Sequence, residues 1–219
     1  EDRARVQMLG VAITALSRGG AYFHAGIDVL RSKSMDRNSF DSGDWFNRLD
    51  WTYQTNYFGT GLPPKADNGE SWPLMQPLLA NDTLRPAPSD IVFARDVTRD
   101  LLAVRESSTL FRLRTAADIR QRLTFPNTGT AQNPVVLVGH VNGKGYPGSV
   151  FKDVLYLINV DKQPQDITIP EEAGKAYQLH PVQAAGSAAD ARIRTGARFE
   201  TGSGRFTVPA RSAAVFVTR

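Results

Sequence analysis

The feature that most constrains the fold is a series of short, apolar, alternating segments in the second half of the chain. Turn-forming pairs such as Asn142-Gly143, Pro147-Gly148 and Asp161-Lys162 separate many of them. Short strands at fairly regular spacing are typical of an antiparallel sandwich. We therefore predict a β-sandwich over residues 107–219. The strand candidates are 135–141, 154–160, 166–169, 176–181, 197–200, 205–208 and 213–218.

The first half of the chain has a different pattern. Residues 3–17 are predicted to form a helix, since Val6, Leu9, Ile13 and Leu16 recur at helical spacing. Met8, Val11 and Ala12 widen that stripe, so we expect burial on more than one side. Gly19-Gly20 ends the helix, and the run Ala21–Ala25 favours a buried strand. Helix, tight turn and strand are one half of an α/β repeat, which needs neighbouring strands.

Prolines and glycines shape the rest of the first half. Residues 26–69 are loop-like, with one helical turn expected between Phe46 and Trp51. Pro73 and Pro77 limit any helix over 72–80 to a short one. Ser89 is a good N-cap for a helix that runs to about Glu106. Another turn or two of helix is expected at 115–123, and the Ala/Gly/Ser-rich stretch 181–191 is expected to be a mobile loop.

Composition excludes several classes of protein. The 219 residues are 41% hydrophobic and 22% charged, which is ordinary for a globular protein. Cysteine is absent, which excludes disulfides and thiolate chemistry. No apolar run is long enough for a membrane span. The net charge of +4 comes from arginines scattered among acids, so we predict no nucleic-acid partner. The start lacks a signal-peptide pattern and an initiator Met, which fits a chain cut from a longer one.

The segment 21–51 combines charged groups with aromatic rings. Rings can cover the apolar face of a sugar, while carboxylates and guanidinium groups hydrogen-bond its hydroxyls. We predict that Asp44 and Arg48 share one face of a helical turn. The alternative is a surface ion pair. Trp45, Phe46, Trp51 and Tyr57 either stack on sugar or pack the loop, and Asp41 either contacts ligand or shapes a turn. Arg31 and Lys33 either line a cleft or form loop salt bridges.

The histidines and acids give no metal-ligand pattern. His24 lies in the apolar run and is expected to be a core residue, while His140 and His180 look structural. The run Asp36–Asp41 lacks the glycine of an EF-hand and has Phe40 at a ligand position. We therefore assign no metal ligand and no cofactor, and leave open only a looser structural Ca²⁺ site.

The run FHAGIDVLRSKSMDRNSFDSGDWFNRLDW resembles the segment after the eighth barrel strand in pullulanases, debranching enzymes of the α-amylase family (glycoside hydrolase family 13). VQMLGVAITALSRGG resembles the preceding barrel helix, and NGESWPLMQPLLAN the segment after the loop. The resemblance implies that 1–106 is the terminal segment of a (β/α)8 barrel and 107–219 the family's β-sandwich, giving an α/β plus all-β chain. It covers only the tail of such an enzyme.

The resemblance also implies a function. The parent enzyme would hydrolyse α-1,6-glucosidic bonds in pullulan, starch or glycogen-derived dextrins, and Asp44 and Arg48 would bind a glucose of the α-glucan substrate. No carboxylate here matches a catalytic motif, so no catalytic residue is assigned and the isolated chain is expected to be inactive. Its partners would be the glucan and the missing N-terminal part of the barrel, without which it is expected to self-associate. A secreted or periplasmic location is compatible with the resemblance. The alternatives are a non-catalytic carbohydrate-binding or interaction module and a purely structural one.

Overall fold

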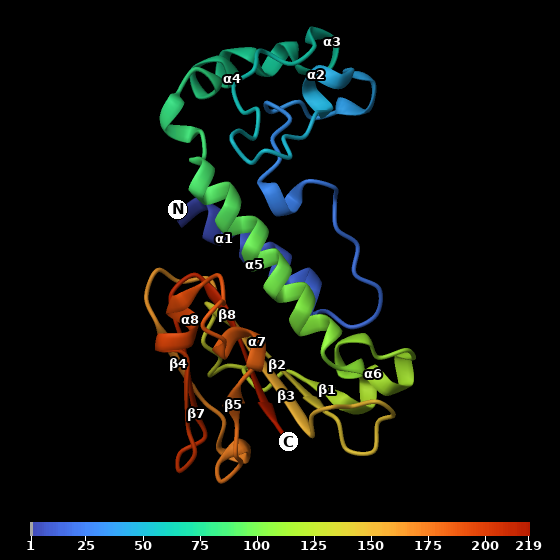
Figure 1. Cartoon of the computed structure of the whole chain (residues 1–219), viewed down its shortest axis with the longest axis vertical. Helices are drawn as coiled ribbons and strands as arrows, with labels where there is room; N and C mark the ends of the chain where they lie inside the picture. Colours follow the sequence, from blue (N-terminus) through green and yellow to red (C-terminus); the bar gives the residue numbers. More distant parts are fainter. Residues whose placement is uncertain (1) are drawn as a thin grey trace. The chain divides into compact units, whose positions relative to one another are not determined.

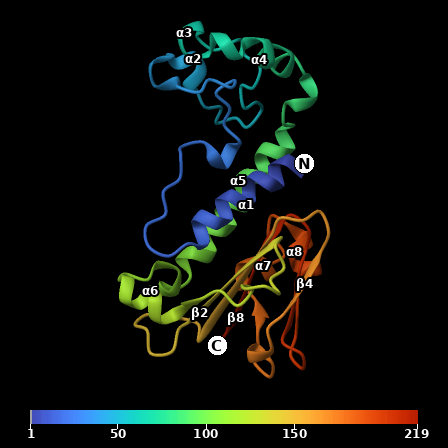
Figure 2. The same ribbon diagram turned by 180° about the vertical axis from the view of Figure 1, so that it is seen from behind.

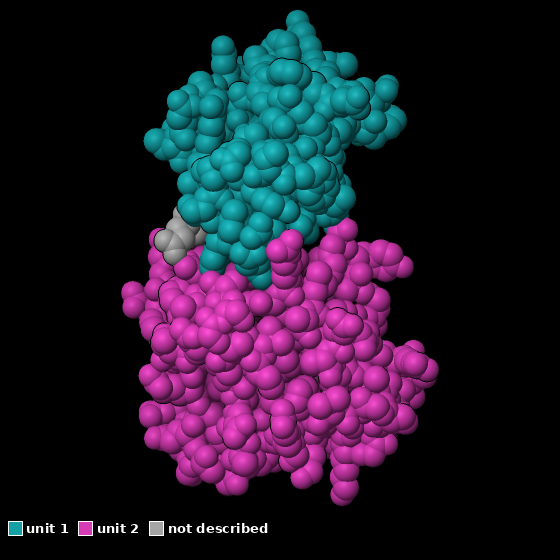
Figure 3. Space-filling model, viewed as in Figure 1, with its two compact units in different colours: residues 1, 24–96 teal, residues 2–23, 97–219 magenta. Residues whose placement is uncertain are grey.

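The computed structural model describes residues 2–219 (Figures 1 and 2). These residues form two compact units (Figure 3). Unit 1 contains residues 24–96, and unit 2 contains residues 2–23 together with 97–219. The boundary at 106/107 predicted from the sequence stays a prediction.

Helices occur in both units, and several of them are a single turn. The α-helices are α1 Asp2–Leu16, α2 Asp44–Asn47, α3 Lys65–Asn68, α4 Trp72–Leu79, α5 Pro88–Glu106, α6 Ala116–Arg122, α7 Pro181–Ala184 and α8 Ala191–Gly196. The 3-10 helices are Ile27–Val29, Ser39–Asp41, Gly69–Ser71, Asp82–Leu84, Thr109–Arg112 and Pro170–Glu172.

Two antiparallel sheets form the core of unit 2. The strands are β1 Leu123–Thr124, β2 Val136–Asn142, β3 Asp153–Asn159, β4 Gln165–Thr168, β5 Gln178–Leu179, β6 Arg198–Glu200, β7 Arg205–Val208 and β8 Ser212–Thr218. The five-stranded sheet has the order β1-β2-β3-β8-β5, and the three-stranded sheet the order β4-β7-β6. Every pairing is antiparallel, which confirms the antiparallel sheets predicted for this half.

The two sheets share one apolar core. Leu155, Leu157 and Phe216 from the larger sheet pack with Phe206 and Ile167 from the smaller one. Full burial of one such side chain contributes roughly 1.5–3 kcal/mol. Strand β8 is buried at every position, because its second face is covered as well. Helix α1 contacts both β3 and β8 and provides that cover.

Helix α1 packs through both large and small apolar side chains. Its buried positions include Ala4, Ala12 and Ala15, whereas Val6 and Ile13 are 42% and 47% exposed. Met8, Leu9, Val11 and Leu16 of the predicted apolar stripe are buried together with these alanines. The expected burial on more than one side is confirmed, since α1 contacts β3 and β8 and its Met8 and Ala15 also contact Thr98 and Arg105 of α5.

An arginine joins α1 to α5. The Arg105 guanidinium donates from Nη1 to the carbonyl oxygens of Ala15, at 2.7 Å, and Ser17, at 2.8 Å. It also donates from Nη2 to the carbonyl of Gly19. The last carbonyls of a helix have no partners within the helix, and a cation there also interacts favourably with the helix dipole. Arg105 thus stabilises the end of α1.

The strand predicted at Ala21–Ala25 is wrong. These residues form no strand, Tyr22 is 93% exposed, and His24 lies at the surface instead of in a core. A strand needs neighbours to accept its backbone hydrogen bonds, and no parallel pair exists among residues 2–219. The described residues accordingly contain no recognisable barrel segment.

Two local predictions also need correction. Ser89 is not the N-cap of α5, which already begins at Pro88; the Asp90 carboxylate instead accepts the backbone N–H of Ala87 at 3.2 Å. The stretch 181–191 is not simply a loop, since it contains α7 and the start of α8.

Candidate functional site

The loops of unit 1 are held by buried polar side chains. Asn68, only 2% exposed, donates to Asp36 Oδ1 at 3.0 Å and accepts the backbone N–H of Arg37 at 3.2 Å. Ser42 donates to Asp36 Oδ2 at 2.5 Å. Burial by itself raises the pKa of Asp36, but the hydrogen bonds from Ser42, Asn38 and Asn68 outweigh it, so the pKa lies below its ordinary value. Asp36 is therefore an ionised anchor of the loop.

Arg31 and Lys33 bind the loop through hydrogen bonds. Arg31 donates to the backbone carbonyls of Ala25, at 3.0 Å, and Asn47, at 2.5 Å. Lys33 donates to Ser39 Oγ at 2.6 Å. Of the two alternatives left by the sequence, the structure favours loop support, although the partners are carbonyl and hydroxyl oxygens and not carboxylates.

Arg48 is stacked between two aromatic rings. Its guanidinium carbon lies 4.3 Å from the centroid of the Trp45 ring and 3.8 Å from that of Tyr57. The Trp45 indole N–H donates to the carbonyl of Thr60 at 3.1 Å, which fixes the first ring. Stacked cations gain roughly 0.5–2 kcal/mol from such rings. The side chain of Arg48 is thus held in place before any ligand arrives.

One helical turn of backbone joins Asp44 to Arg48, but the two side chains form no ion pair among the described residues. Helix α2 ends at Asn47, and Arg48 has an extended backbone, with φ −66° and ψ 153°. The Arg48 backbone N–H still donates to the Asp44 carbonyl at 2.9 Å, whereas its guanidinium stacks on the Trp45 and Tyr57 rings. Asp44 is exposed at the first position of α2.

The remaining predicted site residues lie near the same turn of chain. Trp45 is 54% exposed, Phe46 is half-buried, and Asp41 is exposed at the end of the 3-10 helix Ser39–Asp41. The structure therefore presents a carboxylate, an immobilised guanidinium and an exposed ring from one short segment. Whether these side chains bind substrate stays a prediction.

Backbone strain is concentrated in unit 1. Leu30, Ser34, Met35, Tyr53 and Tyr57 all have positive φ angles, between 48° and 66°. Such conformations cost of order 1–3 kcal/mol each and persist only where surrounding contacts impose them. Tyr57, whose ring contacts the Arg48 guanidinium, is one of these positions. Sequence reasoning did not find this role, because a left-handed backbone at a tyrosine has no local sequence signal.

Within residues 2–219, no group of three or more His, Cys, Asp or Glu side chains is arranged to hold a metal ion. None of the helices in the described part of the chain combines the length and apolar character that crossing a bilayer demands.

A family model described as "Alpha-1,6-glucosidases, pullulanase-type, C-terminal" matches residues 53–219. The chain belongs to the pullulanase-type alpha-1,6-glucosidases. It is 42% identical over 224 aligned residues to Pullulanase 1, chloroplastic, of Arabidopsis thaliana, with 99% of the chain covered. It is 31% identical over 215 residues to a pullulanase of Klebsiella pneumoniae, with 97% covered. The family resemblance read from the sequence is confirmed.

Solved pullulanase structures share this fold. The crystal structure of PulA from Klebsiella oxytoca superimposes with a TM-score of 0.86 at 29% identity, over 99% of this chain. The maltotriose complex of PulA from Klebsiella pneumoniae gives the same score, identity and coverage. The chain spans 20% and 23% of those two structures, and 23% and 19% of the Arabidopsis and Klebsiella pneumoniae pullulanases.

Proposed function

We propose that this chain is the C-terminal part of a debranching enzyme that hydrolyses α-1,6-glucosidic bonds in pullulan, starch or glycogen-derived dextrins. The observation that carries the proposal is the 42% identity to a plant pullulanase over 99% of the chain. In the complete enzyme, residues 1–106 would be the terminal segment of the (β/α)8 barrel. The neighbouring barrel strands would then supply the strand pairing that Ala21–Ala25 does not have in this structure.

The chemistry would be divided between this chain and the rest of the enzyme. A retaining glycosidase needs a nucleophile and a general acid whose carboxyl groups are about 5 Å apart. None of the carboxylates here matches a catalytic motif, so we assign the reaction itself to residues outside this chain. Its contribution would be substrate binding and support of the barrel.

Asp44 and Arg48 would bind one glucose unit of the substrate. The exposed carboxylate accepts hydrogen bonds from sugar hydroxyls, and the guanidinium donates to their oxygens. The stack on Trp45 and Tyr57 supports this role, because an arginine that is already immobilised loses little side-chain entropy when it binds. The exposed ring of Trp45 could then cover the apolar face of the same sugar or of its neighbour.

The test is kinetic and uses the complete enzyme. Asp44→Ala should lower kcat/KM on pullulan by about ten- to a hundredfold, since a hydrogen bond to a charged group contributes roughly 1.5–3 kcal/mol. Glu70→Ala is the matched control, because it removes another exposed carboxylate of unit 1. The double variant with Arg48→Ala should lose less than the sum of the single losses, since both groups bind one sugar. Equal losses in Asp44→Ala and Glu70→Ala would refute the assignment.

A second measurement tests whether the reaction is carried out by residues outside this chain. The isolated chain should release no reducing ends from pullulan. Release that disappears when a carboxylate of this chain is replaced would place the reaction here and overturn the proposal.

A further inference from the structure

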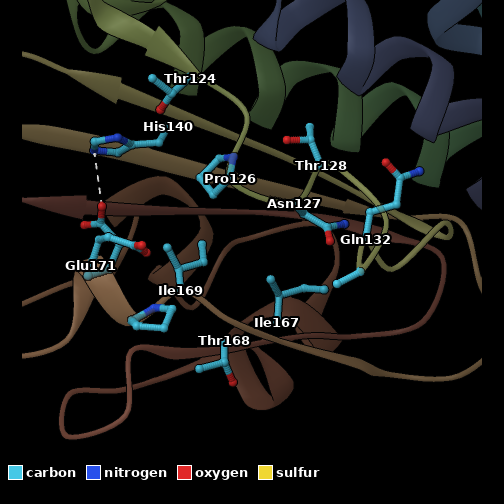
Figure 4. A pocket seen from close by; sticks show the side chains of 13 residues that line it. Thr124, Pro126, Asn127, Thr128, Gln132, His140, Ile167, Thr168, Ile169 and Glu171 are labelled. Atoms are coloured by element: carbon cyan, nitrogen blue, oxygen red, sulfur yellow. Dashed lines mark ion pairs between the residues drawn. The ribbon is translucent and has the colours of Figure 1, made fainter.

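Unit 2 contains a pocket of its own, separate from the loops that carry Asp44 and Arg48. Its volume is about 560 Å³, and it is lined by residues of the segments 124–132 and 167–172, with His140 between them. In Figure 4 the side chains of these two segments face each other across the pocket. Small-ligand sites usually have volumes of about 300–1,000 Å³.

The pocket has apolar walls and a rim of hydroxyl and amide groups. Ile167 and Ile169, 7% and 4% exposed, form part of the wall and belong to the core between the sheets. The exposed side chains of Thr124, Gln132 and Thr168 supply the polar rim (Figure 4). Apolar surface beside a few polar groups is the usual character of a site for an organic ligand.

A largely buried carboxylate lines the pocket. The Glu172 side chain is only 6% exposed, and its Oε2 accepts from the Tyr177 hydroxyl at 2.7 Å and pairs with Lys175 Nζ at 2.6 Å. Its Oε1 lies 4.0 Å from His140 Nε2 (dashed line in Figure 4), beyond hydrogen-bond distance. That nitrogen instead lies 2.8 Å from Asp153 Oδ1. Oε1 therefore keeps the capacity to accept a hydrogen bond from a ligand in the pocket.

The wall formed by residues 124–132 is already ordered. The Asn127 amide donates to the carbonyls of Asn133, at 2.8 Å, and Val136, at 2.6 Å, and its Oδ1 accepts the Asn133 backbone N–H at 2.8 Å. Asn133 in turn donates to Gln165 Oε1, at the start of β4, at 2.9 Å. A pocket held in this way needs little reorganisation to accept a ligand.

We propose that this pocket binds a neutral sugar unit of an α-glucan chain, away from the reaction. A sugar hydroxyl would donate to Glu172 Oε1, further hydroxyls would meet the threonine and glutamine side chains, and the C–H face would lie on the isoleucines. Glu171 and Glu172 make the pocket unfavourable for anions. The choice of an α-glucan rests on the proposed function, whereas the preference for a neutral polyol comes from the pocket.

The test follows the backbone amide NMR signals of the ¹⁵N-labelled 219-residue chain during titration with maltotriose, up to roughly 20 mM so that millimolar binding is detected. We expect saturable shifts in residues 124–132 and 167–172. Thr168→Trp fills the pocket and should abolish those shifts, and Gln132→Trp, on the facing wall, is a second variant should the first not fold. Thr201→Trp places the same exposed ring outside the pocket and should leave them unchanged.

The same spectra separate this inference from the proposed function. Shifts at residues 44–60 that Asp44→Ala removes report on the unit 1 site, and shifts in the pocket should survive that substitution. Absence of pocket shifts at the highest maltotriose concentration overturns the inference, whatever happens at residues 44–60. The inference is also overturned if the pocket shifts persist in both tryptophan variants. It is overturned as well if the pocket signals shift with methylammonium chloride but not with maltotriose. Pocket shifts without any at residues 44–60 count against the unit 1 site alone.

Discussion

His180 should make unit 2 sensitive to mild acid. It is 1% exposed and caps α7: its Nδ1 accepts the backbone N–H of Val182 at 3.2 Å. The ring proton therefore lies on Nε2, which donates to Ser107 Oγ at 2.9 Å. The ring also packs edge-on against Phe151, with centroids 5.4 Å apart. A second proton would break the bond to Val182 and place a charge among apolar groups. Burial accordingly lowers the pKa of His180 from 6.5 to about 4.

The pKa difference sets the size of the effect. An unfolded histidine has a pKa of about 6.5, and each unit of pKa shift corresponds to about 1.4 kcal/mol. Above pH about 6.5 both states are neutral, so the stability contribution is fully present. As the pH falls from about 6.5 to about 4, His180 takes up its proton in the unfolded state first. The free energy of unfolding therefore decreases by about 3 kcal/mol.

His180→Asn isolates this effect. Asparagine keeps an N-cap acceptor but does not titrate. Urea unfolding between pH 4 and pH 7.5, followed at NMR signals of β3 and β8, measures unit 2 specifically. The variant should be less stable at pH 7.5 because it loses ring packing. The difference in free energy of unfolding between the unsubstituted chain and the variant should change by about 3 kcal/mol in the variant's favour as the pH falls to 4. Two curves that stay parallel would refute the reasoning.

Three further substitutions test other contacts. Gly139→Ala would place a Cβ 2.1 Å from Cζ of Tyr156, so the free energy of unfolding in urea should fall by about 1–3 kcal/mol. Adding Tyr156→Ala to this variant should restore part of the loss. Arg105→Met should speed amide hydrogen exchange in the last turn of α1 by about tenfold or more, since carbonyls there lose a charged donor; unchanged exchange would contradict its capping role. In the complete enzyme Tyr57→Ala should raise KM by about three- to tenfold while Tyr57→Phe does not, because a ring and not a hydroxyl immobilises Arg48.

The sequence predicts the strands of unit 2 well because their signals are local. Strands β2, β3 and β8 combine apolar β-branched residues with nearby turn pairs, so each could be identified by itself. Helix α8 was not predicted, because the residues before it are rich in Ala, Gly and Ser and favour a loop. Asp190, which accepts the backbone N–H of Arg192 at 3.1 Å, was an available N-cap signal for it.

The site was harder to predict because its geometry depends on distant residues. The spacing of Asp44 and Arg48 predicts one helical turn, but it does not reveal that the Trp45 and Tyr57 rings stack on the guanidinium. The run Ala21–Ala25 has the composition of a strand, yet composition supplies no partner strand. Glu172 and His140 meet only because the sheets bring them together, which no sequence spacing reveals.

Unit 2 is built from two separated pieces of chain, and this has a consequence for how it assembles. Helix α1, which covers β3 and β8, is joined to them through the long excursion of residues 24–96. Closing an excursion of that length costs on the order of 4 kcal/mol of chain entropy, so the helix should dock late in folding. Once it is docked, one protease cut within residues 24–96 should leave two fragments that stay associated. A fragment that begins near residue 107 should likewise bind a synthetic peptide with the sequence of α1, because the peptide would cover β3 and β8 as the helix does.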